Sequence, residues 1–145
     1  MKALVIFDST FGNTQKIAET IAKELDTKAV PVSKVATKEL NDLDLIVVGS
    51  PIISWKPSES MGKFLASLGR DQMKNVKAAA FDTRIRLFVH GDAATKISQA
   101  LAEAGAEIVT EPQAFKVRGT EGPLLGGEIE KAVDWAKLIK TKVGK

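Results

Sequence analysis

The chain has 145 residues, of which 44% are hydrophobic and 27% are charged, and its formal net charge is +3. This composition excludes a disordered chain, and so small a positive excess excludes a nucleic-acid interface. No apolar run approaches the roughly 20 residues that cross a bilayer, and zero cysteines exclude disulfides, thiolate metal sites and cysteine nucleophiles. We expect one cytoplasmic domain over residues 1–145, with no membrane or nucleic-acid partner.

Strand-like and helix-like patterns alternate along the chain. Residues 2–7 form a short apolar run rich in β-branched and aromatic side chains, which predicts a buried strand. Apolar residues then recur at helical spacing up to Leu25. The same reasoning predicts strands at 28–32, 44–49, 76–81 and 107–109, the last resuming at 114–117, and helices at 58–68, 92–104 and 127–140.

This alternation predicts an α/β fold of three αβα layers, with a five-stranded parallel sheet covered by helices on both faces. In such sheets a ligand binds beyond the carboxyl ends of the strands, where the strand order reverses. Four segments follow those ends, and the functional residues are expected there: residues 8–14, 50–57, 82–91 and 118–127.

The first of these segments has the chemistry of an anion site. It contains three hydroxyl side chains, one amide and one glycine, has no lysine or arginine, and opens onto a predicted helix. Backbone N–H groups and hydroxyls at a helix N-terminus bind anions well. Without the lysine of a nucleotide-triphosphate loop, the segment suits a phosphate that is held but not transferred. The alternative is an ordinary turn in which Ser9, Thr10 or Asn13 only caps the helix.

With this loop the chain resembles the flavodoxin family over nearly its whole length. The family's phosphate loop has the form Ser/Thr-x-x-Gly-x-Thr with an alanine on the following helix, and residues 9–14 and Ala18 match it. The resemblance implies the strand order 2-1-3-4-5, a short-chain member, and FMN as the cofactor. It also implies that the cofactor contacts Ser9, Thr10, Phe11, Gly12, Asn13 and Thr14.

The second segment resembles the family's first flavin-flanking loop. Trp55 is its one aromatic residue and is expected to stack on the flavin ring, because both surfaces are flat and apolar. Ile53 is an alternative contact, and Trp55 is alternatively a cover for the edge of the core. The candidate residues of this segment are Ser50, Pro51, Ile52, Ile53, Ser54 and Trp55.

The third segment departs from the family, which usually places a tyrosine there, whereas this chain contains no tyrosine. Backbone groups near Thr83 and Arg84 are expected at the polar edge of the flavin, and Phe88 either stacks or joins the core. His90 is interpreted as a polar residue before a helix. The candidate contacts are Asp82, Thr83, Arg84 and Phe88. The fourth segment is interpreted as a return turn rather than a cofactor loop.

Positive residues around the expected mouth of the site are expected to affect the reduction potential of the flavin. Lys56, Arg84, Arg86 and Arg118 are expected to stabilise an anionic reduced flavin. We therefore expect a less reducing carrier than acidic family members, with an acidic docking partner. Pairing of these residues with surface carboxylates is the alternative.

The resemblance implies an FMN-binding protein that shuttles electrons between redox partner proteins, as a monomer or weak dimer, without catalytic or metal-ligating residues. Two alternatives stay open: an FMN-dependent NAD(P)H:quinone-type oxidoreductase on the same fold, and a binding module without FMN. A phosphoacceptor receiver domain is excluded. It needs paired acids after the first strand and an aspartate after the third, where this chain has Asp8 alone and Gly49-Ser50.

Overall fold

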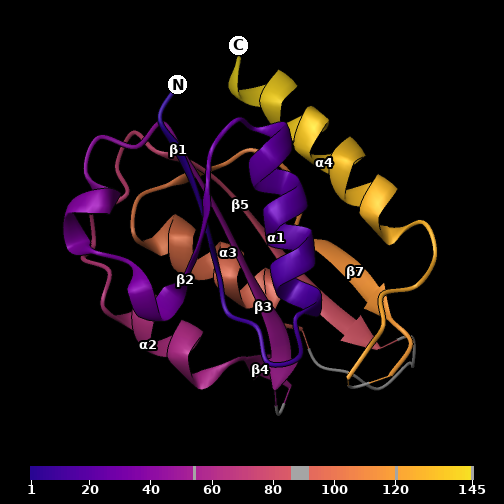
Figure 1. Cartoon of the computed structure of the whole chain (residues 1–145). Coiled ribbons are helices and arrows are strands. Elements are labelled where there is room, and N and C mark those ends of the chain that lie inside the picture. Colours follow the sequence, from indigo (N-terminus) through magenta and orange to yellow (C-terminus); the bar gives the residue numbers. More distant parts are fainter. Residues whose placement is uncertain (54, 86–91, 120, 145) are drawn as a thin grey trace.

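A computed structural model describes residues 1–53, 55–85, 92–119 and 121–144 (Figure 1). The strands are β1 (Ala3–Phe7), β2 (Ala29–Pro31), β3 (Leu45–Ile53), β4 (Lys56–Pro57), β5 (Lys77–Ile85), β6 (Glu107–Ile108) and β7 (Gln113–Val117). The helices are α1 (Asn13–Glu24), α2 (Glu59–Ala66), α3 (Ala94–Glu103) and α4 (Glu128–Val143), with short 3-10 turns at Val32–Lys34 and Thr37–Leu40.

The sheet has the predicted strand order. Its path is β2-β1-β3-β5-β6, and all the pairs along it are parallel. The expected fifth strand is divided into β6 and β7, which both pair with β5, while β4 is a short antiparallel addition to β3. The order reverses between β1 and β3, and this is where an open sheet of this kind binds ligands. The predicted 2-1-3-4-5 topology is confirmed.

Helices cover both faces of the sheet, which explains why its strands are nearly continuous apolar runs. Helices α1 and α4 lie side by side on one face, and α2 and α3 cover the other (Figure 1). Alternate residues of β1 show the division: Val5 packs toward α1 and α4, whereas Leu4 and Ile6 pack toward α2 and α3. Within the described residues, no helix has the length and apolar character needed to cross a membrane.

Close packing fixes the middle of the sheet on the α1–α4 side. The ring of Phe81 lies directly over Gly49, where a Cβ would come within 2.1 Å of that ring. Phe81, Phe115 and Trp135 then pack edge to face, with ring centroids 5.8 to 6.0 Å apart. A side chain at position 49 would displace this aromatic group, so glycine is required here by the close approach of a ring.

The predicted ends of two strands are wrong. β3 continues to Ile53 and β5 continues to Ile85, four residues beyond the expected ends. The two extensions pair with each other, and β4 and β7 supply their outer partners. Residues predicted to lie in loops therefore lie on strands, because tertiary pairing outweighs the polar residues Ser50 and Asp82 that suggest strand ends.

The outer edge of β7 is covered by the return segment and α4. The segment reverses as predicted, with the N–H of Arg118 donating to the carbonyl of Pro123 at 2.8 Å. Further along β7, the backbone N–H of Lys116 donates to the Glu128 carboxylate, and the Lys131 ammonium donates to the Ala114 carbonyl. Several backbone groups on the side of β7 that faces away from β5 therefore already have partners.

Candidate functional site

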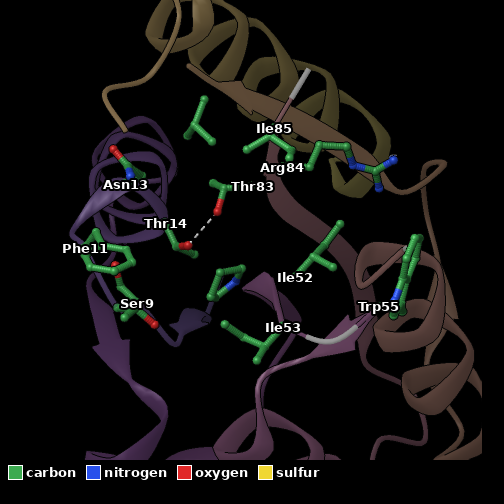
Figure 2. Close-up of a pocket in the computed structure, with 13 residues that line it drawn as sticks. Ser9, Phe11, Asn13, Thr14, Ile52, Ile53, Trp55, Thr83, Arg84 and Ile85 are labelled. Carbon is green, nitrogen blue, oxygen red and sulfur yellow. Dashed lines mark hydrogen bonds between the residues drawn. The ribbon is translucent and has the colours of Figure 1, made fainter. Parts of the chain in front are cut away.

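A cavity of about 260 Å³ opens at the carboxyl ends of the strands (Figure 2). It is lined by Ser9, Thr10, Phe11, Asn13 and Thr14 from the first predicted segment, Pro51, Ile52, Ile53 and Trp55 from the second, Thr83, Arg84 and Ile85 from β5, and Val117 from β7. Most residues singled out in the sequence therefore lie around one hollow, although they come from segments far apart in the chain.

The first segment forms a tight loop that turns into α1. Gly12 precedes the helix with φ +90°, a left-handed conformation that suits glycine. The Ser9 hydroxyl accepts hydrogen bonds from the N–H groups of Gly12 at 3.0 Å and Gln15 at 3.3 Å. Ser9 therefore caps two N–H groups at the start of α1, and the positive end of the helix dipole beside them favours a bound anion.

Thr14 joins this loop to the interior strand β5. Its side chain is buried, and its Oγ1 lies 2.8 Å from Oγ1 of Thr83 (Figure 2). One hydroxyl donates to the other, and the accepting hydroxyl keeps its own proton for a second acceptor. Both residues line the cavity, so the pair can present a hydroxyl donor to a ligand there.

Behind the loop, Asp8 and Ser50 have structural contacts. The Asp8 carboxylate accepts from the Ser9 N–H at 3.0 Å and from the Ser58 hydroxyl at 2.5 Å. Ser58 caps α2, and its own N–H donates to Oγ of Ser50 at 3.0 Å. Ser50 is fully buried and does not line the cavity. It fixes β3 against α2 and so supports the cavity from outside.

The opposite end of the cavity is apolar and exposed. Trp55 and Ile53 have 56% and 43% of their surface exposed, and Phe11, on the loop at the other end, has 51% exposed. These are three of the six large hydrophobic residues exposed among those described. All three line the same cavity. Exposed apolar groups around one cavity mark a binding surface. An indole covering the core edge would be largely buried, so that interpretation of Trp55 is wrong.

Trp55 lies at the tip of the β3–β4 hairpin in an unusual backbone conformation. Ile53 pairs with Lys56 across the hairpin, and Trp55 has φ +70°. A bulky residue in this left-handed region is uncommon and strained. The carbonyl of Trp55 accepts from the Asp92 N–H at 3.3 Å and from the Lys96 ammonium at 3.4 Å. The tip is therefore held against the start of α3.

Asp82 and Arg84 form a buried ion pair at the end of β5. Arg84 donates from Nε and Nη2 to the two Asp82 oxygens at 2.8 and 2.5 Å, and Asp82 is fully buried. The hydrogen bond that Arg84 donates to Asp82 raises the pKa of Arg84 above its ordinary value. Asp82 also accepts from the N–H groups of Ala93 and Ala94 at the start of α3. It is absent from the cavity lining and anchors that helix.

The pairing corrects one expectation from the sequence. Arg84 lines the cavity, but its charge is compensated by Asp82 and, at 3.5 Å, by Asp92. It therefore does not present free positive charge at the mouth. Lys56 and Arg118 are exposed. Ser54, Arg86, Phe88 and His90 fall outside the described residues.

Two lining residues were missed in the sequence. Ile85 and Val117 are register partners on β5 and β7, and Ile85 lies on the same face of its strand as Thr83. For Ile85, the signal was the alternation of residues along a longer strand, which the interpretation of residues 82–91 as a loop hid. Val117 lies on the predicted strand 114–117, but its pairing with Ile85 had no signal in the sequence. Both belong to the apolar part of the lining.

Comparisons with known proteins agree with this geometry. A family model described as "Flavodoxin domain" matches residues 4–120. The uncharacterized protein MJ0298 of Methanocaldococcus jannaschii is 34% identical over 153 residues, covering 96% of this chain and 98% of that protein. Oxidised flavodoxin 1 from Bacillus cereus superposes with a TM-score of 0.84 at 20% identity, covering 97% of this chain and 98% of that one. A flavodoxin from the domain Archaea gives 0.80 at 24% identity, with both chains fully covered. The chain belongs to the flavodoxin family.

Proposed function

We propose that this protein binds FMN and carries electrons between redox partner proteins. The observation that carries the proposal is one cavity with two different ends. A polar loop without a cation forms one end, and exposed apolar side chains form the other. FMN has the matching division into a phosphate and a flat ring system. Family membership supports the same cofactor.

The polar end fits a phosphate monoester. The N–H groups at the start of α1 and the hydroxyls of Ser9, Thr10 and Thr14 would hold it. The phosphate of a carrier's cofactor is bound but never transferred to another molecule. The loop therefore needs to bind an anion and does not need to stabilise the charge that develops during phosphoryl transfer. This explains why donors without formal charge suffice.

The apolar end fits an aromatic ring. Trp55 and Ile53 on the hairpin, with Ile85 and Val117 on the sheet, would contact it. Burying these exposed apolar surfaces against a flat ring is favourable, at about 25 cal/mol per Å² of apolar area removed from water. Stacking against the indole adds about 0.5–1.5 kcal/mol.

Bound FMN would supply reversible one- and two-electron redox chemistry. The side chains around it support a carrier rather than a substrate-converting enzyme. Among the described lining residues, Arg84 is the one charged group, and it is committed to Asp82 and Asp92. The remaining polar side chains are hydroxyls and one amide, which bind and orient but are poor general acids and bases at neutral pH.

An acidic partner is the finer part of the proposal. Lys56 on β4 is exposed, and Lys96 on α3 donates to the Trp55 carbonyl, so two positive side chains flank the hairpin tip. Positive charge around an exposed apolar tip favours encounter with an acidic surface.

The experiment is titration of the cofactor-free protein with FMN and with riboflavin. We expect a 1:1 complex with quenched flavin fluorescence, and weaker binding of riboflavin, which lacks the phosphate. A protein that binds neither flavin is the FMN-free binding module, which contradicts the proposal. Steady oxidation of NAD(P)H with a quinone by the FMN-loaded protein alone favours the oxidoreductase.

A further inference from the structure

The phosphate loop is contacted by the return segment that follows β7. Asn13 is the first residue of α1, is buried and lines the cavity. Its side-chain Nδ2 donates to the carbonyl oxygen of Glu121 at 3.2 Å, across 108 residues of sequence. In Figure 2 this amide lies apart from the Thr14–Thr83 pair. The side chain of Asn13 is therefore oriented by a distant part of the chain.

The return segment has a fixed position against β7. The N–H of Gly122 donates to the carbonyl of Gly119 at 2.9 Å, and Val117 and Leu124 form an antiparallel bridge. Val117 is itself a lining residue. The turn that touches Asn13 is thus tied to a strand of the sheet, which gives it the rigidity to hold another side chain.

Gly122 allows Asn13 to lie against this turn. A Cβ on Gly122 would come within 2.6 Å of Oδ1 and 2.7 Å of Nδ2 of Asn13. Non-bonded heavy atoms do not approach so closely, so any side chain at 122 must displace the amide. Of the glycines in the described ranges, Gly122 is the one whose Cβ would meet a residue that lines the cavity.

We propose that Gly122 is a positioning residue for the phosphate end of the site and that it strengthens the preference for FMN over riboflavin. This inference rests on the proposed function. With Nδ2 committed to Glu121, the carbonyl end of the Asn13 amide is kept from turning freely into the cavity. A displaced amide brings its partially negative oxygen toward the bound phosphate or shifts the start of α1. Either change weakens phosphate binding and leaves the ring end intact.

The test is Gly122→Ala with Gly127→Ala as the matched control. Both glycines have left-handed backbones, with φ +103° and +88°, but a Cβ at 127 meets nothing within 4 Å. Both variants therefore strain the backbone, but only the Cβ of G122A would collide with Asn13. We expect G122A to lower the ratio of FMN affinity to riboflavin affinity about tenfold, and G127A to leave that ratio at the wild-type value.

A second background separates an effect through Asn13 from a general loosening of the turn. In Asn13→Ala the amide is gone, so adding G122A should leave the FMN:riboflavin ratio of N13A unchanged. A G122A variant with the wild-type ratio overturns the proposal. So does an equal loss of both flavins, or a ratio that falls further in N13A/G122A than in N13A.

A measurement without cofactor keeps this test distinct from that of the proposed function. In ¹⁵N-labelled cofactor-free protein, we expect the side-chain amide signals of Asn13 to shift in G122A and to stay in place in G127A. If wild type binds no FMN, the proposed function fails and the positioning role fails with it, whatever the signals do. Unmoved Asn13 signals in a folded G122A protein overturn the inference alone.

Discussion

The hydroxyl oxygens of Thr14 and Thr83 lie 2.8 Å apart and join the first turn of α1 to the interior strand β5. The two residues are 69 positions apart in sequence, and both are buried at the cavity wall. This bond holds the loop of residues 9–14 at a fixed place relative to the sheet. Loss of either hydroxyl should therefore affect both folding and the binding of a ligand.

Thr83→Val tests this link, because valine keeps the shape and removes the hydroxyl. The variant leaves the Thr14 hydroxyl without its protein partner, and we expect the free energy of unfolding to fall by about 1 kcal/mol. FMN affinity should fall about tenfold for the same reason. Urea denaturation and flavin titration measure the two effects. Thr141→Val, at an exposed position of α4, is the control, and equal behaviour of the two variants would refute the link.

Trp55 combines backbone strain with an exposed ring, and substitutions separate the two. With φ +70°, Trp55→Gly should be more stable than Trp55→Ala by about 1 kcal/mol, since glycine adopts this conformation without strain. Both variants should bind FMN more weakly than wild type, whereas Trp55→Phe keeps an aromatic surface and most of the affinity. Thermal unfolding without cofactor gives the first comparison. Equal stability of W55G and W55A contradicts the strain argument.

Removing the partner of buried Asp82 should be costly. Arg84→Met leaves an uncompensated buried carboxylate, and we expect a loss of about 3–5 kcal/mol. Asp82→Asn in the same chain should restore most of this loss. A neutral amide oxygen can still accept from the Ala93 and Ala94 N–H groups that Asp82 now holds. Chemical denaturation of the single and double variants tests the pair, and an R84M protein as stable as wild type is the contradicting result.

Charge at the hairpin tip should affect electron transfer. Lys56→Glu and Lys96→Glu place negative charge beside Trp55, which disfavours an anionic reduced flavin, and we expect a lower flavin potential. Transfer to an acidic protein acceptor should also slow, and less so at high salt. Lys140→Glu, in the last turn of α4, makes the same change in net charge at the opposite end of the fold. If all three variants shift the potential equally, the local effect is absent.

Glu39 is expected to contribute to the loss of folding stability at low pH. Its pKa is lowered from 4.5 by the hydrogen bond from the Ala36 N–H, and further by Lys28 at 2.9 Å. A lowered folded pKa contributes stability above the ordinary value, and this contribution is lost as pH falls through the folded pKa. The stability difference between wild type and Glu39→Gln should therefore be fully present well above pH 4.5 and should shrink as the pH falls below that value. Lys28→Met keeps the hydrogen bond from the Ala36 N–H. The pH dependence of its stability difference from wild type should therefore be smaller than that of Glu39→Gln.

Local chemistry was predictable from the sequence, and pairing between distant segments was not. The loop from Ser9 to Thr14 is a continuous stretch whose donors, glycine and following helix can all be interpreted together, and five of its six residues line the cavity. The ends of β3 and β5 depend on partners elsewhere in the chain. Ile85 and Val117 became visible as lining residues once that register was known.

The ion pair of Arg84 also could not be predicted from the sequence. In sequence, Arg84 is one of several positive residues near an expected mouth. In the structure its charge is compensated by a carboxylate two residues away on the same strand face. Residues 82–91 were interpreted as a loop, so this ion pair was not predicted. Positions 82 and 84 come together because side chains alternate along a strand. The contact of Asn13 with Glu121 had no local signal at all.

The covered outer edge of β7 has a consequence for self-association. An open strand edge is a template on which another chain can add a strand. Here the Lys116 N–H, the Ala114 carbonyl and the Arg118 N–H are already occupied by Glu128, Lys131 and Pro123. A second copy therefore cannot extend the sheet past β7 unless the return segment and the start of α4 first detach. This side of the protein is protected against edge-to-edge aggregation, with or without a cofactor in the cavity.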